Sequence, residues 1–168
     1  MTLLLGIDIG TSGSKGVLTR DDGTLVASAT REHTTSTPRP GWVEHDALEV
    51  WWADFTALTA ELLPQVPAGE RLGAVGVSGI GPCLLPTDAD ATPLRPAILY
   101  GVDTRAGKQI ADQTATYGEE QVLQRCGSTL TSQAVGPKLA WLREEEPEVY
   151  GRTRRWFMAS SYLAYRLT

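Results

Sequence analysis

Cysteine and histidine are scarce in this chain of 168 residues, which has two of each. Cys83 and Cys126 are far apart, and neither lies in a motif with a second cysteine or a histidine at ligand spacing. A disulfide framework or a zinc site needs more ligands at closer spacing, so the sequence excludes both. We expect both to be reduced thiols in a reducing compartment, buried as small hydrophobic side chains.

Long apolar runs and clusters of positive charge are absent as well. The apolar N-terminal run stops at Asp8 and has no basic region, unlike a signal peptide, and no run approaches the ~20 residues of a membrane span. The net charge is -5, and the basic residues are scattered apart from a short cluster at residues 152–155. The sequence therefore predicts a cytoplasmic protein without nucleic-acid or membrane partners.

The order of predicted elements indicates an α/β domain. Strands are predicted over residues 3–9, 15–19 and 25–31, and a helix runs from an Asp46 N-cap, with Glu49 as its capping-box partner, to Pro64. A continuous apolar strand over residues 72–77 is expected to be buried on both faces. Further elements follow in sequence: short strands at 84–85 and 97–100, helices over 104–116, 119–125 and 137–146, a strand over 155–158 and a last helix capped by Ser160 or Ser161. This order predicts a mixed β-sheet flanked by helices.

The first predicted turn is rich in glycine and hydroxyl groups, in the stretch GIDIGTSGSKGVL at residues 6–18. Small residues let a polyphosphate approach backbone N–H groups closely, and the candidates are Gly10, Thr11, Ser12 and Gly13. Asp8 would hold Mg²⁺ through water, and Lys15 offers a cation. The pattern is neither a Walker loop nor a dinucleotide fingerprint. Considered alone, it fits equally well a tight hairpin whose glycines serve only the backbone.

Six segments occur in the order found in the FGGY carbohydrate kinases: GIDIGTSGSKGVL, GWVEHDALEVWW, VGVSG, LRPAILYGVDTRA, GPKLAWL and SSYLAYRLT. From residue 3 to residue 168 the chain resembles that family, and its xylulokinase-like branch in particular. The resemblance implies a ribonuclease-H-like domain, as in the actin-like ATPases and sugar kinases. It also implies a two-domain enzyme of about 500 residues that transfers the γ-phosphate of MgATP to a sugar hydroxyl. The first domain would bind the sugar and the second the adenine.

The resemblance further implies that residues 1–168 are an incomplete N-terminal domain. The rest of that domain and the ATP-binding domain would follow. In the family the general base is an aspartate downstream of this point, so we expect no catalytic base within the chain and no kinase activity from the chain alone. A homodimer of the full-length protein stays an open alternative.

The resemblance implies a role for a residue of this chain only where the residue matches a motif of the family. Asp8 matches the metal-associated aspartate, Gly10, Thr11 and Ser12 match the phosphate loop, and Asp103 and Arg105 match the W-x-D-x-R motif of the sugar cleft. Departures from the family pattern fall at Lys15, where many members have arginine, at Ile80 and Gly81, where relatives have polar side chains, and at Gly101, where Tyr100 is the candidate replacement for tryptophan. These changes do not alter the reaction class that the resemblance implies, but they leave the identity of the sugar open.

Several alternatives stay open at this stage. Asp103 could cap the helix that follows it, with Arg105 on the helix surface, and Tyr100 could pack as a strand residue rather than as a sugar platform. The leading hypothesis is a kinase for a ketopentose such as xylulose, or for a related polyol. A ribulokinase-like or glycerol kinase-like enzyme and a non-catalytic sugar-binding module are the alternatives.

Overall fold

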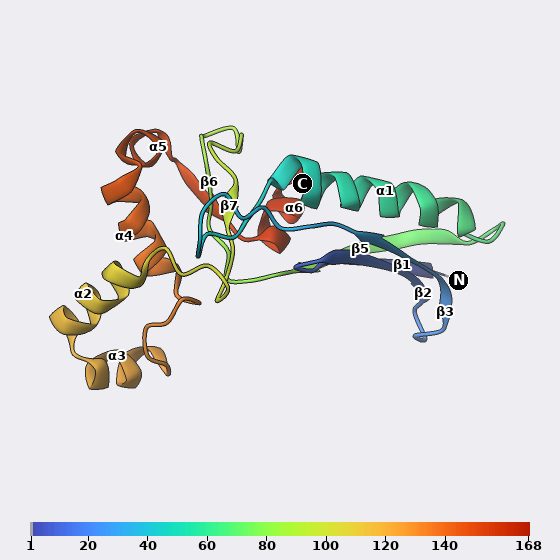
Figure 1. Ribbon diagram of the computed structural model, residues 1–168. Helices are drawn as coiled ribbons and strands as arrows, with labels where there is room; N and C mark the ends of the chain where they lie inside the picture. Colours follow the sequence, from blue (N-terminus) through green and yellow to red (C-terminus); the bar gives the residue numbers. More distant parts are fainter. Residues whose placement is uncertain (1) are drawn as a thin grey trace. The chain divides into compact units, whose positions relative to one another are not determined.

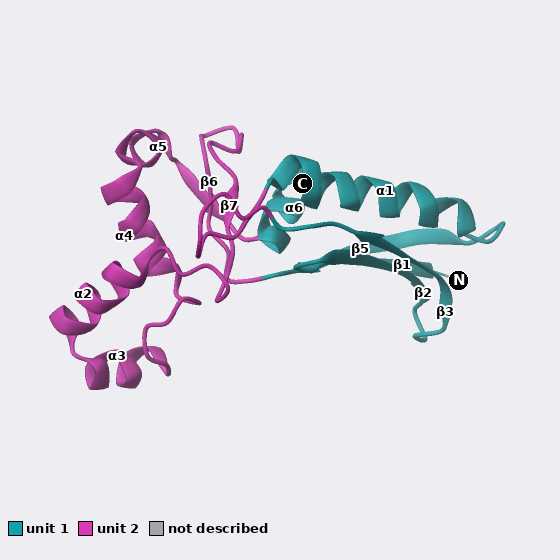
Figure 2. Cartoon of the chain, viewed as in Figure 1, with its two compact units in different colours: residues 1–35, 46–80, 159–168 teal, residues 36–45, 81–158 magenta. Residues whose placement is uncertain are grey.

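The computed structural model describes residues 2–168, and the chain forms two compact units (Figure 2). Unit 1 contains the residues up to 35 together with 46–80 and 159–168, and unit 2 contains 36–45 and 81–158. The chain therefore passes between the units several times. No helix in residues 2–168 is both long enough and apolar enough to cross a bilayer.

Unit 1 is built on a four-stranded sheet with the order β3-β2-β1-β5. The strands are β1 (Thr2–Ile9), β2 (Gly13–Arg20), β3 (Leu25–Glu32) and β5 (Arg71–Gly79). The first three are antiparallel neighbours, whereas β5 pairs with β1 in parallel, so the sheet is mixed as predicted. The register places Asp8 opposite Lys15 on β2 and opposite Ser78 on β5.

Helix α1 (Ala53–Leu62) lies along one face of this sheet (Figure 1). A π-helical turn (Ala47–Trp52) precedes it and a 3₁₀ turn (Leu63–Gln65) follows it. The predicted N-cap is confirmed, because Asp46 Oδ1 accepts from the N–H groups of Leu48 at 2.8 Å and Glu49 at 2.9 Å. The predicted apolar face is buried as well, and its members are Trp51, Phe55, Leu58 and Leu62.

Helix α6 (Ala159–Leu167) contacts β1 and β5 within the same unit. Tyr162 is fully buried, and its ring meets that of Trp51 edge-on with centroids 6.2 Å apart. The helix starts at Ala159, one residue before the first of the predicted caps. Together, α1 and α6 cover the sheet face that carries the apolar side chains of β1, which are Leu3, Leu5, Ile7 and Ile9.

The opposite face of the sheet is open within residues 2–168. Leu4 and Val17, which lie on that face, are 39% and 40% exposed. Val75 of β5 lies opposite Leu5 on the helix-covered face and is itself 41% exposed. The prediction that the apolar strand over residues 72–77 is buried on both faces is therefore wrong for the described chain. The reason is its place in the sheet: β5 is the last strand beside β1, and α6 covers only one side of it.

Unit 2 combines two small sheets with four helices. β4 (Glu44–His45) pairs with β7 (Ala97–Ile98), and β6 (Leu85–Thr87) pairs with β8 (Arg155–Phe157), both antiparallel. The helices are α2 (Gly107–Tyr117), α3 (Glu119–Cys126), α4 (Val135–Glu145) and α5 (Pro147–Arg152). Their core is the buried cluster of Leu84, Ile98, Ala106, Trp141 and Leu142.

The two cysteines differ in their surroundings. Cys83 is 1% exposed, and burial raises the pKa of its thiol to about 12, whereas Cys126, the last residue of α3, is exposed. Our expectation that both are buried is therefore wrong for Cys126.

Because the thiolate is the reactive form, iodoacetamide at neutral pH is expected to modify Cys126 in the folded protein and to reach Cys83 only after unfolding. Mass spectrometry of digested protein measures both sites, and Cys126→Ser, which should take up no label when folded, is the control. Equal labelling of the two thiols in the folded protein would contradict the expectation.

Candidate functional site

The turn between β1 and β2 opens onto a concavity of about 330 Å³ in unit 1. All of the residues predicted to bind phosphate and metal line it: Asp8, Gly10, Thr11, Ser12, Gly13 and Lys15. Thr30 and Glu32 of the neighbouring strand β3 complete the wall. The structure thus gathers this predicted group in one place, with backbone, hydroxyl, ammonium and carboxylate groups around a single opening.

Asp8 lies near the end of β1 with an exposed carboxylate. The hydroxyl of Ser78 on β5 donates to Asp8 Oδ1 at 2.5 Å, which fixes the orientation of the carboxylate. A hard oxygen donor at the rim of an open concavity fits Mg²⁺, which prefers carboxylate, phosphate and water oxygens. No group of three or more His, Cys, Asp and Glu side chains that could hold a metal by themselves occurs in residues 2–168. A metal here would thus depend mainly on ligand and water oxygens.

The glycines of the turn are required by the close approach of backbone to backbone. A Cβ at Gly10 would lie 2.5 Å from the Gly13 carbonyl oxygen, and one at Gly13 would lie 2.8 Å from that of Arg31. The N–H of Gly10 donates to the same Gly13 oxygen at 3.0 Å, closing the hairpin. The structural explanation for these glycines is thus sufficient by itself, and the case for a ligand rests on Asp8, Lys15 and the concavity.

A second, more apolar concavity of about 390 Å³ adjoins the first. Asp8 and Lys15 line both. The remaining wall of the second concavity consists of Gly6, Ile7, Val17, Gly76, Val77 and Ser78. The carboxylate and the ammonium group therefore stand where a polar and an apolar concavity meet on the open face of the sheet.

A buried polar network beside the hairpin was not predicted. His33 Nδ1 lies 2.7 Å from Asp54 Oδ2 on α1, and His33 Nε2 lies 3.1 Å from the Gly10 carbonyl oxygen. Ser14, at the start of β2, donates its hydroxyl proton to the same Asp54 oxygen at 2.6 Å. No motif in the sequence joins these three residues, because each comes from a different element.

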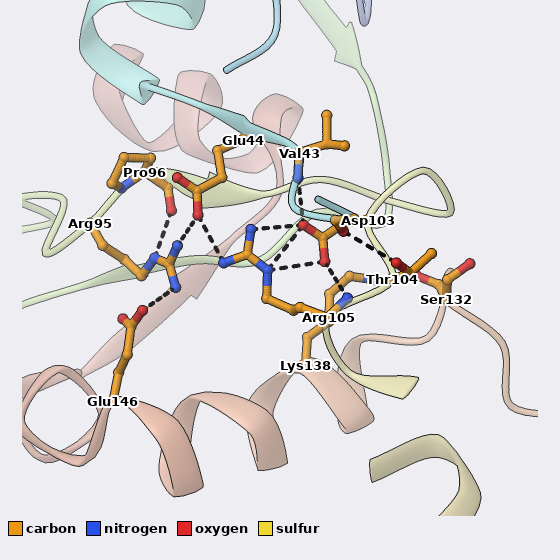
Figure 3. A network of polar contacts seen from close by, with 11 residues as sticks. Val43, Glu44, Arg95, Pro96, Asp103, Thr104, Arg105, Ser132, Lys138 and Glu146 are labelled. Atoms are coloured by element: carbon orange, nitrogen blue, oxygen red, sulfur yellow. Dashed lines mark hydrogen bonds and ion pairs between the residues drawn. The ribbon is translucent and has the colours of Figure 1, made fainter. Parts of the chain in front are cut away.

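Asp103 and Arg105, predicted to lie at the sugar cleft, have side chains that are 0% exposed in unit 2 (Figure 3). Arg105 Nη2 lies 2.7 Å from Asp103 Oδ2, and Arg105 Nη1 forms an ion pair with Glu44 Oε1 at 2.8 Å. The guanidinium also lies 4.1 Å from the ring centroid of Trp42 and 5.0 Å from that of Trp141. The alternative of a helix cap with a surface arginine is wrong, because the N-cap of α2 is Ala106 without a side-chain cap hydrogen bond and Arg105 is buried. The contacts indicate a buried structural role for both residues, and a sugar contact stays a prediction.

Further charges extend this network. Arg95 pairs with Glu44 and, at 2.9 Å, with Glu146, and Lys138 Nζ donates to the Ser132 carbonyl oxygen (Figure 3). Burial lowers the pKa of Lys138 below its ordinary value, and the nearby Asp103 opposes that shift. Three acidic and three basic side chains of unit 2 thus balance in charge, all of them buried except the half-buried Glu146: Glu44, Asp103, Glu146, Arg95, Arg105 and Lys138.

The other predicted substrate residues are divided between the two units. Ile80 belongs to unit 1, where its N–H donates to the Ile9 carbonyl oxygen at 2.8 Å. Gly81 and Tyr100 belong to unit 2; Gly81 precedes a cis bond to Pro82, and Tyr100 is half-buried. Their role in sugar binding stays a prediction.

A three-stranded antiparallel meander continued by a parallel strand, with helices on one face, defines the ribonuclease-H-like fold of actin-like ATPases and sugar kinases. The comparison with solved structures agrees: xylulose kinase from Rhodospirillum rubrum superposes with a TM-score of 0.90 and 34% identity, covering 96% of this chain and 33% of that one. The model of the FGGY family of carbohydrate kinases, N-terminal domain, matches residues 3–168, and the chain belongs to this family.

Curated relatives carry two different names. A xylulose kinase of Lactococcus lactis subsp. lactis is 32% identical over 169 residues, covering 100% of this chain and 33% of the relative. A glycerol kinase of Acaryochloris marina is 35% identical over 150 residues, covering 86% of this chain and 29% of the relative. The chain thus spans about a third of the length of the curated relatives it matches.

Proposed function

We propose that the chain is the N-terminal, sugar-binding part of an ATP-dependent carbohydrate kinase. The full-length enzyme would transfer the γ-phosphate of ATP to a hydroxyl of a ketopentose such as xylulose, or of a related polyol. Membership of the carbohydrate kinase family supports the class. The observation in this chain that supports the proposal is the concavity lined by Asp8, Lys15 and the hairpin of residues 10–13.

Each group around the concavity has a task in this proposal. The backbone N–H groups of residues 11–13 and the hydroxyls of Thr11 and Ser12 would bind phosphate oxygens, and the Lys15 ammonium would offset their negative charge. The Asp8 carboxylate, oriented by Ser78, would hold Mg²⁺ by way of water. Bound Mg²⁺ would neutralise charge that develops on the phosphates during transfer.

The domain assignment is part of the same proposal. Residues 1–168 would form an incomplete first domain, and the general base that takes the proton from the sugar hydroxyl would lie in a later part of the protein. Since positioning and charge neutralisation dominate phosphoryl transfer, the described part supplies phosphate and metal binding rather than the proton transfer.

The experiment is a coupled assay of ADP release by the full-length protein with a panel of sugars and polyols. We expect ADP release that requires Mg²⁺ and a sugar, with D-xylulose among the best substrates. The 168-residue chain alone should give no sugar-dependent ADP release. Sugar binding by the full-length protein without any phosphorylation would instead support the non-catalytic module.

A glycerol kinase-like activity is the second candidate, because a curated glycerol kinase is as similar to this chain as the xylulose kinases are. Both candidates use the same phosphate hairpin and differ only in the acceptor. The ratio of kcat/KM for glycerol to that for D-xylulose decides between them.

A further inference from the structure

His33 contacts the phosphate hairpin twice. Its backbone N–H donates to the Ser12 carbonyl oxygen at 3.2 Å, and its ring Nε2 lies within hydrogen-bond distance of the Gly10 carbonyl oxygen. The ring is in turn held by Asp54, which α1 supplies. A single residue thus connects two carbonyl groups of the hairpin to the helix that covers the sheet.

The direction of a carbonyl group fixes the direction of the next N–H. The peptide bonds of the hairpin are trans, and in a trans peptide the C=O and N–H point in opposite directions. With the Gly10 and Ser12 carbonyl groups held on His33, the N–H groups of Thr11 and Gly13 are turned away from it. His33 therefore sets the direction of two backbone donors in the hairpin.

The hydrogen bonds among His33, Asp54 and Ser14 stabilise this orientation of the hairpin backbone. The two ring nitrogens of His33 contact the Asp54 carboxylate and the Gly10 carbonyl oxygen, so the ring links a charged group on α1 directly to the backbone of the hairpin. The side chains of His33 and Asp54 are 8% and 13% exposed, and Ser14 is fully buried. Charge-assisted hydrogen bonds shielded from water are stronger than neutral, exposed ones.

From this geometry we propose that His33, held by Asp54, is a positioning residue that keeps the hairpin in the conformation that binds the phosphates of the nucleotide. The proposal rests on the proposed function of the hairpin. It adds a residue that touches neither nucleotide nor sugar and acts through the backbone of residues 10–13.

The first test measures the hairpin itself. Hydrogen–deuterium exchange of a peptide spanning residues 6–18 is followed by mass spectrometry in the full-length protein and in three variants. His33→Gln and Asp54→Asn should each speed exchange of the hairpin amides about tenfold, as expected when a charge-assisted hydrogen bond is lost. Glu61→Gln should leave exchange unchanged: it breaks the exposed Arg31–Glu61 pair, which joins the same strand β3 to the same helix α1 at 2.5 Å without touching the hairpin.

The second test separates positioning from stability alone. In His33→Gln the KM for ATP should rise about tenfold while the KM for the sugar stays the same, since only the phosphate hairpin is loosened. If His33→Gln does not fold, the same two KM values are measured in Asp54→Asn, which keeps the imidazole ring of His33. Equal hairpin exchange in His33→Gln and Glu61→Gln overturns the proposal, and so does faster exchange with an unchanged KM for ATP. If the wild-type protein shows no sugar-dependent ADP release, the proposed function fails, and the exchange comparison still decides whether His33 holds the hairpin.

Discussion

Replacing Asp8 with asparagine is expected to lower kcat for sugar phosphorylation by the full-length protein about a hundredfold to a thousandfold, the range found when one charge-stabilising group is removed. Asparagine keeps the size of the side chain, and its oxygen can still accept from Ser78. What it removes is the negative charge at the rim of the concavity, on which Mg²⁺ binding would depend. The measurement is ADP release at saturating sugar over a range of Mg²⁺ concentrations, where the variant should need more metal.

Asp21→Asn is the matched control for this prediction. Asp21 is an exposed aspartate next to the other end of β2, in the turn to β3, so the same change of charge occurs on the same sheet away from the concavity. It should leave kcat and the Mg²⁺ requirement as they are. An Asp8→Asn enzyme with the kcat of the wild type would remove Asp8 from the metal site and return it to the alternative of a turn residue.

The hairpin could be predicted from the sequence because its information is local. Asp8, the small residues 10–13 and Lys15 lie close together in the sequence, on two strands joined by a short turn. The alternation of side chains along β1 and β2 puts Asp8 and Lys15 on the same face. The sequence could not tell whether the glycines serve a ligand or the backbone. The structure shows that close approach of the Gly13 and Arg31 carbonyl oxygens is a sufficient reason for both glycines.

The His33 network could not be predicted, because its members are brought together only by tertiary packing. His33 follows β3, Asp54 lies in the first turn of α1, and Ser14 is the second residue of β2. An isolated histidine after a strand and an aspartate in the first helical turn each have an ordinary local explanation. Nothing in their spacing along the chain points to a common site.

The errors in the fold have a similar origin. An apolar run predicts burial, but whether a strand is covered depends on its neighbours in the sheet, and β5 is the last described strand beside β1. The two-residue strand β4 is too short to show alternation, so it was not predicted. Helix α4 starts at Val135 rather than at Pro137, and the short α5 that follows it was missed, because boundaries depend on tertiary contacts more than element types do.

Replacing Arg105 with alanine is expected to lower the free energy of unfolding by about 3–5 kcal/mol, because it removes one partner of a buried ion pair. Asp103 and Glu44 would be left as buried carboxylates without the guanidinium that now lies 2.7 Å and 2.8 Å from them. The variant also loses the contacts of the guanidinium with the rings of Trp42 and Trp141. Urea denaturation followed by tryptophan fluorescence measures the loss, with these two rings reporting on the network.

Lys108→Ala provides the matched control, since Lys108 pairs with Asp112 on α2 of the same unit with side chains 71% and 58% exposed. Exposed pairs of this kind contribute less than about 0.5 kcal/mol. If Arg105→Ala costs no more than Lys108→Ala and instead raises the KM for the sugar, Arg105 belongs to the sugar cleft and the buried arrangement is not its main role. If Arg105→Ala is much less stable and the fraction that stays folded has an unchanged KM for the sugar, Asp103 and Arg105 stabilise the interior of unit 2 and do not bind the sugar. The W-x-D-x-R resemblance would then mark a packing motif, since the guanidinium is fully buried against two indole rings and two carboxylates.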